Sequence, residues 1–241
     1  MYGPAVDRRV IILLAFGWIA FAIAGRAAGQ ANSNLPNGIC SADTADQKAE
    51  AREADCLRKL GAPVSRKGER LTLKIENGTS KIYQDNPKAC ANDDAQNCVV
   101  HWLVGYHPGA RVYSILITYY EGSNVELVSA RTGNILRVGG EPHFSADGSR
   151  FLIIDNDLAY GGPYNLAVGS ATNGSLQLDW QRADEGEPME WHIQRWIDDD
   201  HIALRVFPAN TAPKCPDNDC DAILTRFNSG WAVGRLPAKQ Q

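Results

Sequence analysis

Hydrophobic and polar residues alternate along most of the chain from Leu71 onward. Gly, Asn, Asp and Pro break the alternation every few residues. Because successive side chains of a strand point to opposite faces, this period of two predicts antiparallel strands joined by tight turns. The expected strands are Leu71–Glu76, Ser80–Gln84, Val99–Tyr106, Arg111–Tyr120, Asn124–Ser129, Ile135–Val138, Arg150–Asp155, Tyr164–Ser170, Leu176–Gln181, Trp191–Ile197, His201–Phe207, Ala222–Phe227 and Trp231–Val233. The sequence therefore predicts a mainly β fold.

The segment before these strands has a different pattern. "SADTADQKAEAREADCLRKLG" is rich in Ala, Glu, Lys and Arg, with Ser41 as a candidate N-cap and Gly61 at its end. These features predict a short N-terminal helix. The following "APVSRKGER" is interpreted as a linker. We therefore divide this part of the chain into a helical segment with its linker, residues 30–68, and a β domain, residues 69–241.

One hairpin pattern recurs along the β region. "VELVSARTGNILRV" and "LAVGSATNGSLQL" each contain a strand, a turn with Gly and a return strand, and their glycines, Gly133 and Gly174, lie 41 residues apart. Fainter copies surround Gly78 and Gly230, with cysteine couples in the longer gaps. A period of about 40 residues with about four strands in each unit is typical of β-propeller blades.

The stretch "EPHFSADGSRFLIIDND" (Glu141–Asp157) resembles the start of a blade in TolB-type, WD40-like β-propeller repeats. The matching residues are Pro142, Phe144, Ser145, Asp147, Gly148 and Arg150. In such a turn Gly148 adopts a positive φ, and Phe144 packs between neighbouring blades. The resemblance implies small or partial β-propeller-like antiparallel sheets. An open, partial propeller and a β-sandwich both stay open as arrangements.

The first 29 residues have the features of a secretory signal peptide. Arg8 and Arg9 precede an apolar run from Val10 to Gly25, and Ala27 and Gly29 form a small-residue cleavage pattern. The alternative is an N-terminal membrane anchor, but the run is shorter than the about 20 residues that span a bilayer. We therefore expect a periplasmic or secreted protein with no stable membrane anchor after cleavage.

The charge of the chain argues against a nucleic-acid partner. The precursor has 24 basic and 28 acidic residues and a formal net charge of −4. No run of Lys and Arg is present in the sequence, whereas nucleic-acid-binding proteins carry a basic surface.

Six cysteines follow the expected signal peptide, in three local couples. An even number of cysteines on an exported chain predicts disulfides. The expected pairs are Cys40–Cys56, Cys90–Cys98 and Cys215–Cys220. Free thiols or a metal site are the alternative.

No common catalytic motif is present in the sequence. The nucleophile elbow GxSxG, the zinc motif HExxH, the P-loop and the dinucleotide-binding fingerprint are all missing. The five histidines are scattered, and the acidic clusters around Asp155, Asp198 and Asp217 fit solvated turns. We therefore expect no cofactor, no metal site and no enzyme activity.

Aromatic residues provide the candidate binding site. Tyrosines fall at corresponding ends of the two best hairpin units, where stacked units would bring them to one rim beside acidic residues. Tyr is favoured at recognition surfaces because it combines a large apolar area with a polar tip. The candidate binding residues are Tyr120, Glu121, Asp155, Asp157, Tyr160 and Tyr164. The alternative is that these tyrosines pack between sheets.

The sequence thus favours an exported binding protein of the cell envelope, with a protein or an envelope polymer as its partner. An inhibitor or immunity protein against a secreted enzyme is the first alternative, and a hydrolase with an unrecognised site is the second.

Overall fold

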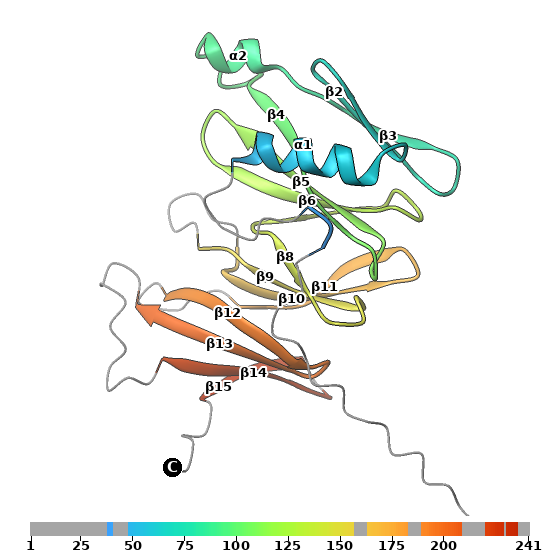
Figure 1. Ribbon diagram of the computed structural model, residues 1–241. Helices are drawn as coiled ribbons and strands as arrows, with labels where there is room; N and C mark the ends of the chain where they lie inside the picture. The colour runs from blue at the N-terminus through green and yellow to red at the C-terminus, as the bar shows by residue number, and fades with distance from the viewer. Residues whose placement is uncertain are drawn as a thin grey trace, which may run out of the picture. The chain divides into compact units, whose positions relative to one another are not determined.

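The protein is built mainly from antiparallel strands, as the alternating pattern predicts. The computed structural model describes residues 38–40, 48–156, 163–182, 189–208, 220–228 and 230–235 (Figure 1). The expected mainly β fold with a short N-terminal helix is confirmed. The predicted signal peptide lies outside the described residues.

The strands form four separate sheets in chain order. The first sheet contains β1 (Val64–Lys67), β2 (Arg70–Lys74) and β3 (Ser80–Gln84). The second contains β4 (Val99–His107), β5 (Val112–Tyr119), β6 (Ser123–Ser129) and β7 (Ile135–Val138). The third contains β8 (Pro142–Phe144), β9 (Arg150–Ile154), β10 (Leu166–Thr172) and β11 (Ser175–Arg182). The fourth contains β12 (Met189–Asp198), β13 (His201–Pro208), β14 (Asp221–Phe227) and β15 (Gly230–Arg235).

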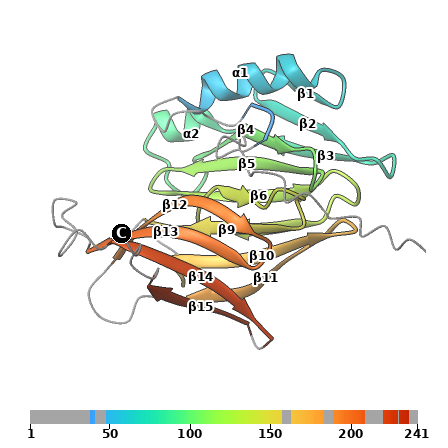
Figure 2. The ribbon, with the colours of Figure 1, turned by 60° about the horizontal axis from the view of Figure 1, so that its bottom comes forward.

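In each sheet, every strand pairs antiparallel with the strand before it, and the described strands form no closed barrel or propeller. Three clusters of buried side chains join successive sheets. The strands of these sheets are drawn in Figure 2. The third sheet is buried on both faces: Phe151 of β9 packs with residues of the second sheet, and Leu152 packs with residues of the fourth. This explains why "FLII" is an uninterrupted apolar run.

The glycines of the hairpin pattern all lie in the last hairpin of their sheets. Gly133 has φ 78° and Gly174 has φ 83°, so both turns use the left-handed region that favours glycine. The Thr132 hydroxyl of the second sheet donates a hydrogen bond to the Gly174 carbonyl of the third at 2.8 Å. A Cβ atom at Gly174 would lie 2.6 Å from Thr132 Cγ2. Corresponding hairpins of these two sheets therefore lie against each other.

The Ser145–Gly148 turn has the predicted structure. Ser145 Oγ lies 2.7 Å from Asp147 Oδ1, and Gly148 has φ 74°. The turn joins β8 to β9 and contacts the turn before β5 at Gly109. Phe144 packs on His107 of the second sheet, with ring centroids 4.3 Å apart.

The N-terminal helix shares its core with the first two sheets. Helix α1 (Ala49–Leu60) ends at Gly61, which has φ 62° and donates its N–H to the Leu57 carbonyl. Cys56 is fully buried and forms a disulfide with Cys40. The helix begins after Lys48, which makes no side-chain cap, while Ser41 lies outside the described residues.

Three short elements were not expected from the sequence. Strand β1 lies inside the segment interpreted as a linker, where only Val64 is buried and the other residues are polar. The three-residue strand β8 and helix α2 (Pro87–Ala91) are too short to show a period. Among the described residues, no helix has the length and apolar character needed to cross a membrane.

Candidate functional site

A buried charge network connects α1 with the first two sheets. Arg66 of β1 donates to Asp85 Oδ2 at 2.6 Å and to Glu53 Oε1 at 2.9 Å. His101 Nδ1 lies 2.8 Å from Asp85 Oδ1, and the Leu103 N–H donates to Glu53 Oε1 at 2.9 Å. Burial alone would raise the pKa of Asp85, but hydrogen bonds from His101 and Arg66 outweigh burial and hold that pKa below its ordinary value. Because both carboxylates are buried and saturated with donors, the network serves to join elements.

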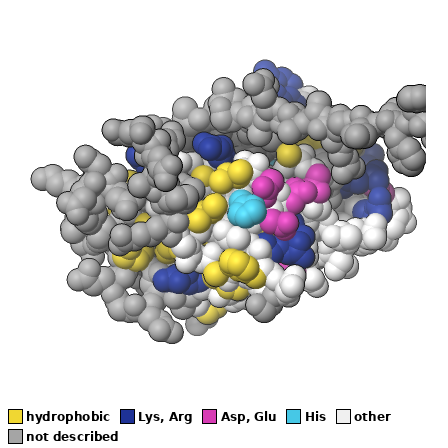
Figure 3. Space-filling model, turned by 90° about the horizontal axis from the view of Figure 1, so that it is seen from below, with side chains coloured by type: hydrophobic (Ala, Val, Ile, Leu, Met, Phe, Trp, Pro, Cys, Tyr) yellow, Lys and Arg dark blue, Asp and Glu magenta, His cyan; other side chains and the backbone are white. Residues whose placement is uncertain are grey.

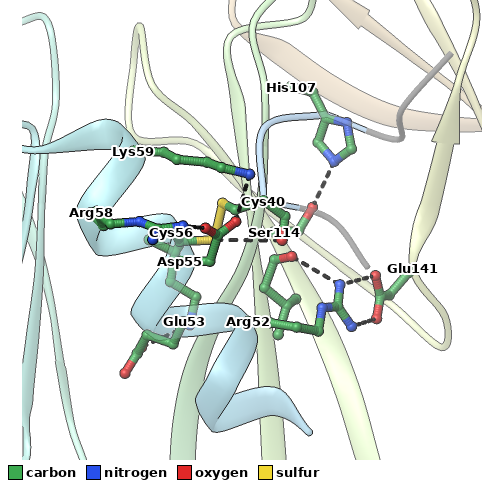
Figure 4. The surroundings of a disulfide bond; sticks show 12 residues. Cys40, Arg52, Glu53, Asp55, Cys56, Arg58, Lys59, His107, Ser114 and Glu141 are labelled. Atoms are coloured by element: carbon green, nitrogen blue, oxygen red, sulfur yellow. Dashed lines mark hydrogen bonds and ion pairs between the residues drawn. A yellow bond between two sulfur atoms is a disulfide. The ribbon is translucent and has the colours of Figure 1, made fainter. Parts of the chain in front are cut away.

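A second charged contact of α1 lies near the Cys40–Cys56 disulfide (Figure 4). The guanidinium of Arg52 donates to both carboxylate oxygens of Glu141, at 2.5 and 2.6 Å, and to the Val104 carbonyl at 2.8 Å. Arg52 is buried, while the Glu141 side chain is partly exposed. This bidentate pair ties the helix to the segment that leads into the third sheet.

His107 and Ser114 have the residue types of a nucleophilic site, but they form a core contact. His107 Nε2 lies 3.2 Å from Ser114 Oγ (Figure 4), and both side chains are buried. Burial, with a smaller contribution from His143, lowers the pKa of His107 to about 3. A nucleophile and its base must reach substrate. We therefore assign this pair to the core.

The structure separates the predicted site residues by burial. Tyr120 is 45% exposed, and Glu121 is also exposed. Asp155 and Tyr164 are buried at 6% and 8% exposure, and Tyr164 packs between the second and third sheets. Burial raises the pKa of the Tyr164 hydroxyl, against a hydrogen bond from the Gly139 backbone that lowers it. For Tyr164, this position between sheets is the alternative that the sequence left open. Asp157 and Tyr160 lie outside the described residues.

Tyr120 contacts a loop that a disulfide closes. Its hydroxyl donates to Asp93 Oδ1 at 3.1 Å. Asp93 follows α2 and has φ 57°, and the Cys90–Cys98 disulfide closes this loop as predicted. Within the loop, Cys98 N–H donates to the Asp94 carbonyl at 3.0 Å. We define the Tyr120 surface as Asp93, Asp94, Tyr120 and Glu121, all of which are exposed.

Sequence reasoning did not identify Asp93. It lies 27 residues from Tyr120, and nothing in the local pattern of "CANDDAQNC" indicates which side chain reaches a tyrosine. The cysteine couple was the available signal, since a short closed loop limits where its polar residues can lie.

The third predicted disulfide is only partly described. Cys220 is disulfide-bonded and buried. Cys215, its expected partner, lies outside the described residues.

The outer face of the fourth sheet is a second exposed surface, which carries mixed charges. Figure 3 shows the molecule from this side, where hydrophobic, acidic and basic side chains and a histidine lie together. His192 Nε2 lies 3.0 Å from Glu190 Oε1, and Arg205 Nε lies 3.3 Å from Asp221 Oδ1. The His192 ring also meets Phe207 edge to face at 5.5 Å. Because Arg205 pairs with Asp221 on this face, the charge of that arginine is compensated within the sheet.

The described residues contain no group of three or more His, Cys, Asp or Glu side chains that could hold a metal ion. Comparison with protein-family models, curated proteins and solved structures finds no match.

Proposed function

We propose that the chain is an exported binding protein of the cell envelope that recognises a partner protein through the Tyr120 surface. The observation that carries the proposal is the position of Tyr120. It is a large aromatic side chain, 45% exposed, whose hydroxyl is held by Asp93 in a loop closed by the Cys90–Cys98 disulfide.

This arrangement reduces the entropy lost on binding. A tyrosine has few rotatable bonds, and the hydrogen bond to Asp93 further limits the position of its ring. The disulfide restricts the loop before the partner arrives. A contact surface that is ordered in advance leaves more of its interaction energy for affinity.

The charge of the surface supports a basic partner. Asp93 contacts the tyrosine, Asp94 and Glu121 are the chain neighbours of this pair, and none of the three carboxylates forms an ion pair within the described residues. Complementary charge speeds encounter and selects between partners. A basic protein surface fits this site better than a polyanionic polymer.

Two observations support export and the repeat architecture. Disulfides persist mainly in oxidising compartments, and the cysteines Cys40, Cys56, Cys90 and Cys98 are paired in the structure. The second, third and fourth sheets each have four antiparallel strands, and four-stranded antiparallel sheets are the unit of propeller proteins. We propose that these sheets are propeller-type blades that form an open series.

Capture from envelope extract tests the proposed function. Immobilised wild-type protein, Tyr120→Ala and Phe227→Ala are incubated with the extract, and bound proteins are identified by mass spectrometry. Phe227 is a matched control, because it is an aromatic residue with 57% exposure on a different sheet. We expect a basic protein that wild type and Phe227→Ala retain and Tyr120→Ala loses. Equal capture by all three would reject this surface.

An inhibitor or immunity protein is the second candidate. The closed loop that ends at Cys98 is exposed from Ala91 to Asn97, and a rigid exposed loop suits insertion into the cleft of an enzyme. If the captured partner is a secreted hydrolase, its activity is measured with and without the protein. Inhibition that Tyr120→Ala abolishes selects this candidate, and unchanged hydrolase activity selects simple binding.

A further inference from the structure

The outer face of the first sheet carries a group of exposed cations. The inward residues of this sheet are buried, so the alternate residues Lys67, Arg70 and Lys74 point outward, and all three are exposed. Ile82 of β3 lies on the same face and is 45% exposed. In register, Ile82 pairs with Thr72, which lies between Arg70 and Lys74 on β2.

Two of the cations oppose each other directly. Lys67 and Arg70 are cross-strand partners, and such side chains have Cβ atoms about 4.5–5.5 Å apart. Like charges at this spacing destabilise a sheet. Glu69 in the intervening turn makes no ion pair with either, and none of the three cations forms an ion pair within the described residues.

This face differs from the rest of the protein in charge. The chain as a whole is acidic, with a formal net charge of −4, so composition does not explain three cations on one face that lack an ion pair in the described part of the chain. On the outer face of the fourth sheet, by contrast, Arg205 pairs with Asp221. A local arrangement that costs stability and has no partner within the described residues indicates an external partner.

The cations are also held on a rigid base. The opposite face of the sheet packs Leu71, Leu73 and Tyr83 into the core shared with α1 and the second sheet. The backbone positions of the outward residues are therefore fixed, and their spacing is a property of the sheet.

That spacing defines a pattern for the partner. Successive outward residues on a strand lie about 6.6 Å apart, so Arg70 and Lys74 are separated by about 13 Å, with the Thr72–Ile82 pair midway. An extended peptide has the same repeat, and strands on stacked sheets align to within about 30°. In such a peptide, acidic residues at positions i and i+4 would lie opposite Arg70 and Lys74. An apolar residue at i+2 would lie opposite the Thr72–Ile82 pair.

We propose that this face, formed by Lys67, Arg70, Lys74 and Ile82, docks an extended acidic protein segment of the pattern acidic–x–apolar–x–acidic. Polyphosphate or an anionic lipid surface would use the cations but would leave Ile82 in contact with charge. The face shares no residue with the Tyr120 surface, so it provides a second interaction of opposite sign.

Titration of the labelled mature protein tests this proposal by NMR. The probe is a synthetic peptide with Glu-Ser-Leu-Ser-Glu at its centre. A control peptide of the same composition has the central order Leu-Ser-Glu-Glu-Ser. Polyphosphate and phosphatidylglycerol vesicles form separate arms. We expect the first peptide to shift the amide signals of Arg70, Thr72 and Ile82, and to bind more tightly than the control peptide.

Two variants and a matched control measure how much these side chains contribute to peptide affinity. Lys67→Gln/Arg70→Gln/Lys74→Gln should weaken peptide binding by about tenfold, and Ile82→Thr by about threefold. Lys48→Gln/Arg131→Gln/Arg195→Gln removes the same net charge at other exposed positions and should leave binding within about twofold. Equal binding of both peptides, equal loss in the two triple variants, or binding of polyphosphate or vesicles without the peptide would overturn the proposal.

Discussion

Asp85→Asn is expected to destabilise the fold by about 2–3 kcal/mol at neutral pH. Asp85 accepts hydrogen bonds from Arg66 and from the backbone and ring of His101, at 2.6 to 2.9 Å. An asparagine oxygen can still accept from the His101 backbone, but its NH₂ group would face the Arg66 guanidinium. Removing one partner of a buried ion pair costs about 3–5 kcal/mol. Because Arg66 keeps its contact with Glu53, we expect a smaller loss.

The pH dependence of this effect follows from the lowered pKa of Asp85. In the folded protein this pKa lies below 3.8, so near pH 4 the unfolded chain binds protons that the folded protein does not. The stabilisation from Asp85 is therefore complete above the unfolded pKa and is lost as the pH falls through the folded pKa. The difference in unfolding free energy between wild type and Asp85→Asn should shrink on acidification below pH 4.

Urea unfolding at pH 7 and at pH 3 measures both effects. Asp200→Asn is the control, because Asp200 pairs with Arg226 at 3.1 Å in an exposed contact, which contributes about 0–1 kcal/mol. A loss under about 0.5 kcal/mol for Asp85→Asn at pH 7 would refute the assignment of this network to joining elements. A difference that grows on acidification would refute the electrostatic argument.

Three further predictions concern the hairpins, the core and export. Gly174→Ala should lower the unfolding free energy by about 1–3 kcal/mol in a thermal unfolding assay, because it adds left-handed backbone strain and a clash with Thr132. Gly78, with φ 87° and open space around it, is the control, and Gly78→Ala should lower the unfolding free energy by less. The His107 ring should not titrate in NMR spectra between pH 8 and 5, because burial lowers its pKa to about 3. In the unfolded chain the same ring binds a proton near its ordinary pKa of 6.5, so this group lowers the stability of the fold as the pH falls below 6.5. Intact mass of the protein from its native compartment should lack residues 1–29, and a mass that retains them would indicate an anchor.

Most strands could be predicted because their signals are local. The strand expected at Ile135–Val138 is found with the same bounds, since glycine turns and alternating residues determine it. β1 was missed because "VSRK" has one buried apolar residue and depends on pairing with β2. Short charged strands of this kind form through tertiary contacts.

The candidate site was less predictable than the strands, because the tertiary fold decides which of its side chains are exposed. Tyr120 and Tyr164 have similar local sequences beside glycines, yet one is exposed and the other packs between two sheets. Glu53, Arg66 and Asp85 lie far apart in the sequence, whereas the fold buries Glu53 and Asp85 and joins all three residues. Such contacts join distant segments and leave no local pattern.

The most direct measurement compares the affinity of the captured partner with the stability of the same variants. We expect Tyr120→Ala to weaken binding by about thirtyfold, as truncation of an interface anchor does, while its melting temperature stays near that of wild type. Phe227→Ala should retain wild-type affinity. Unchanged affinity in Tyr120→Ala, or a loss of affinity that accompanies early unfolding, would contradict the proposal that Tyr120 is a binding residue.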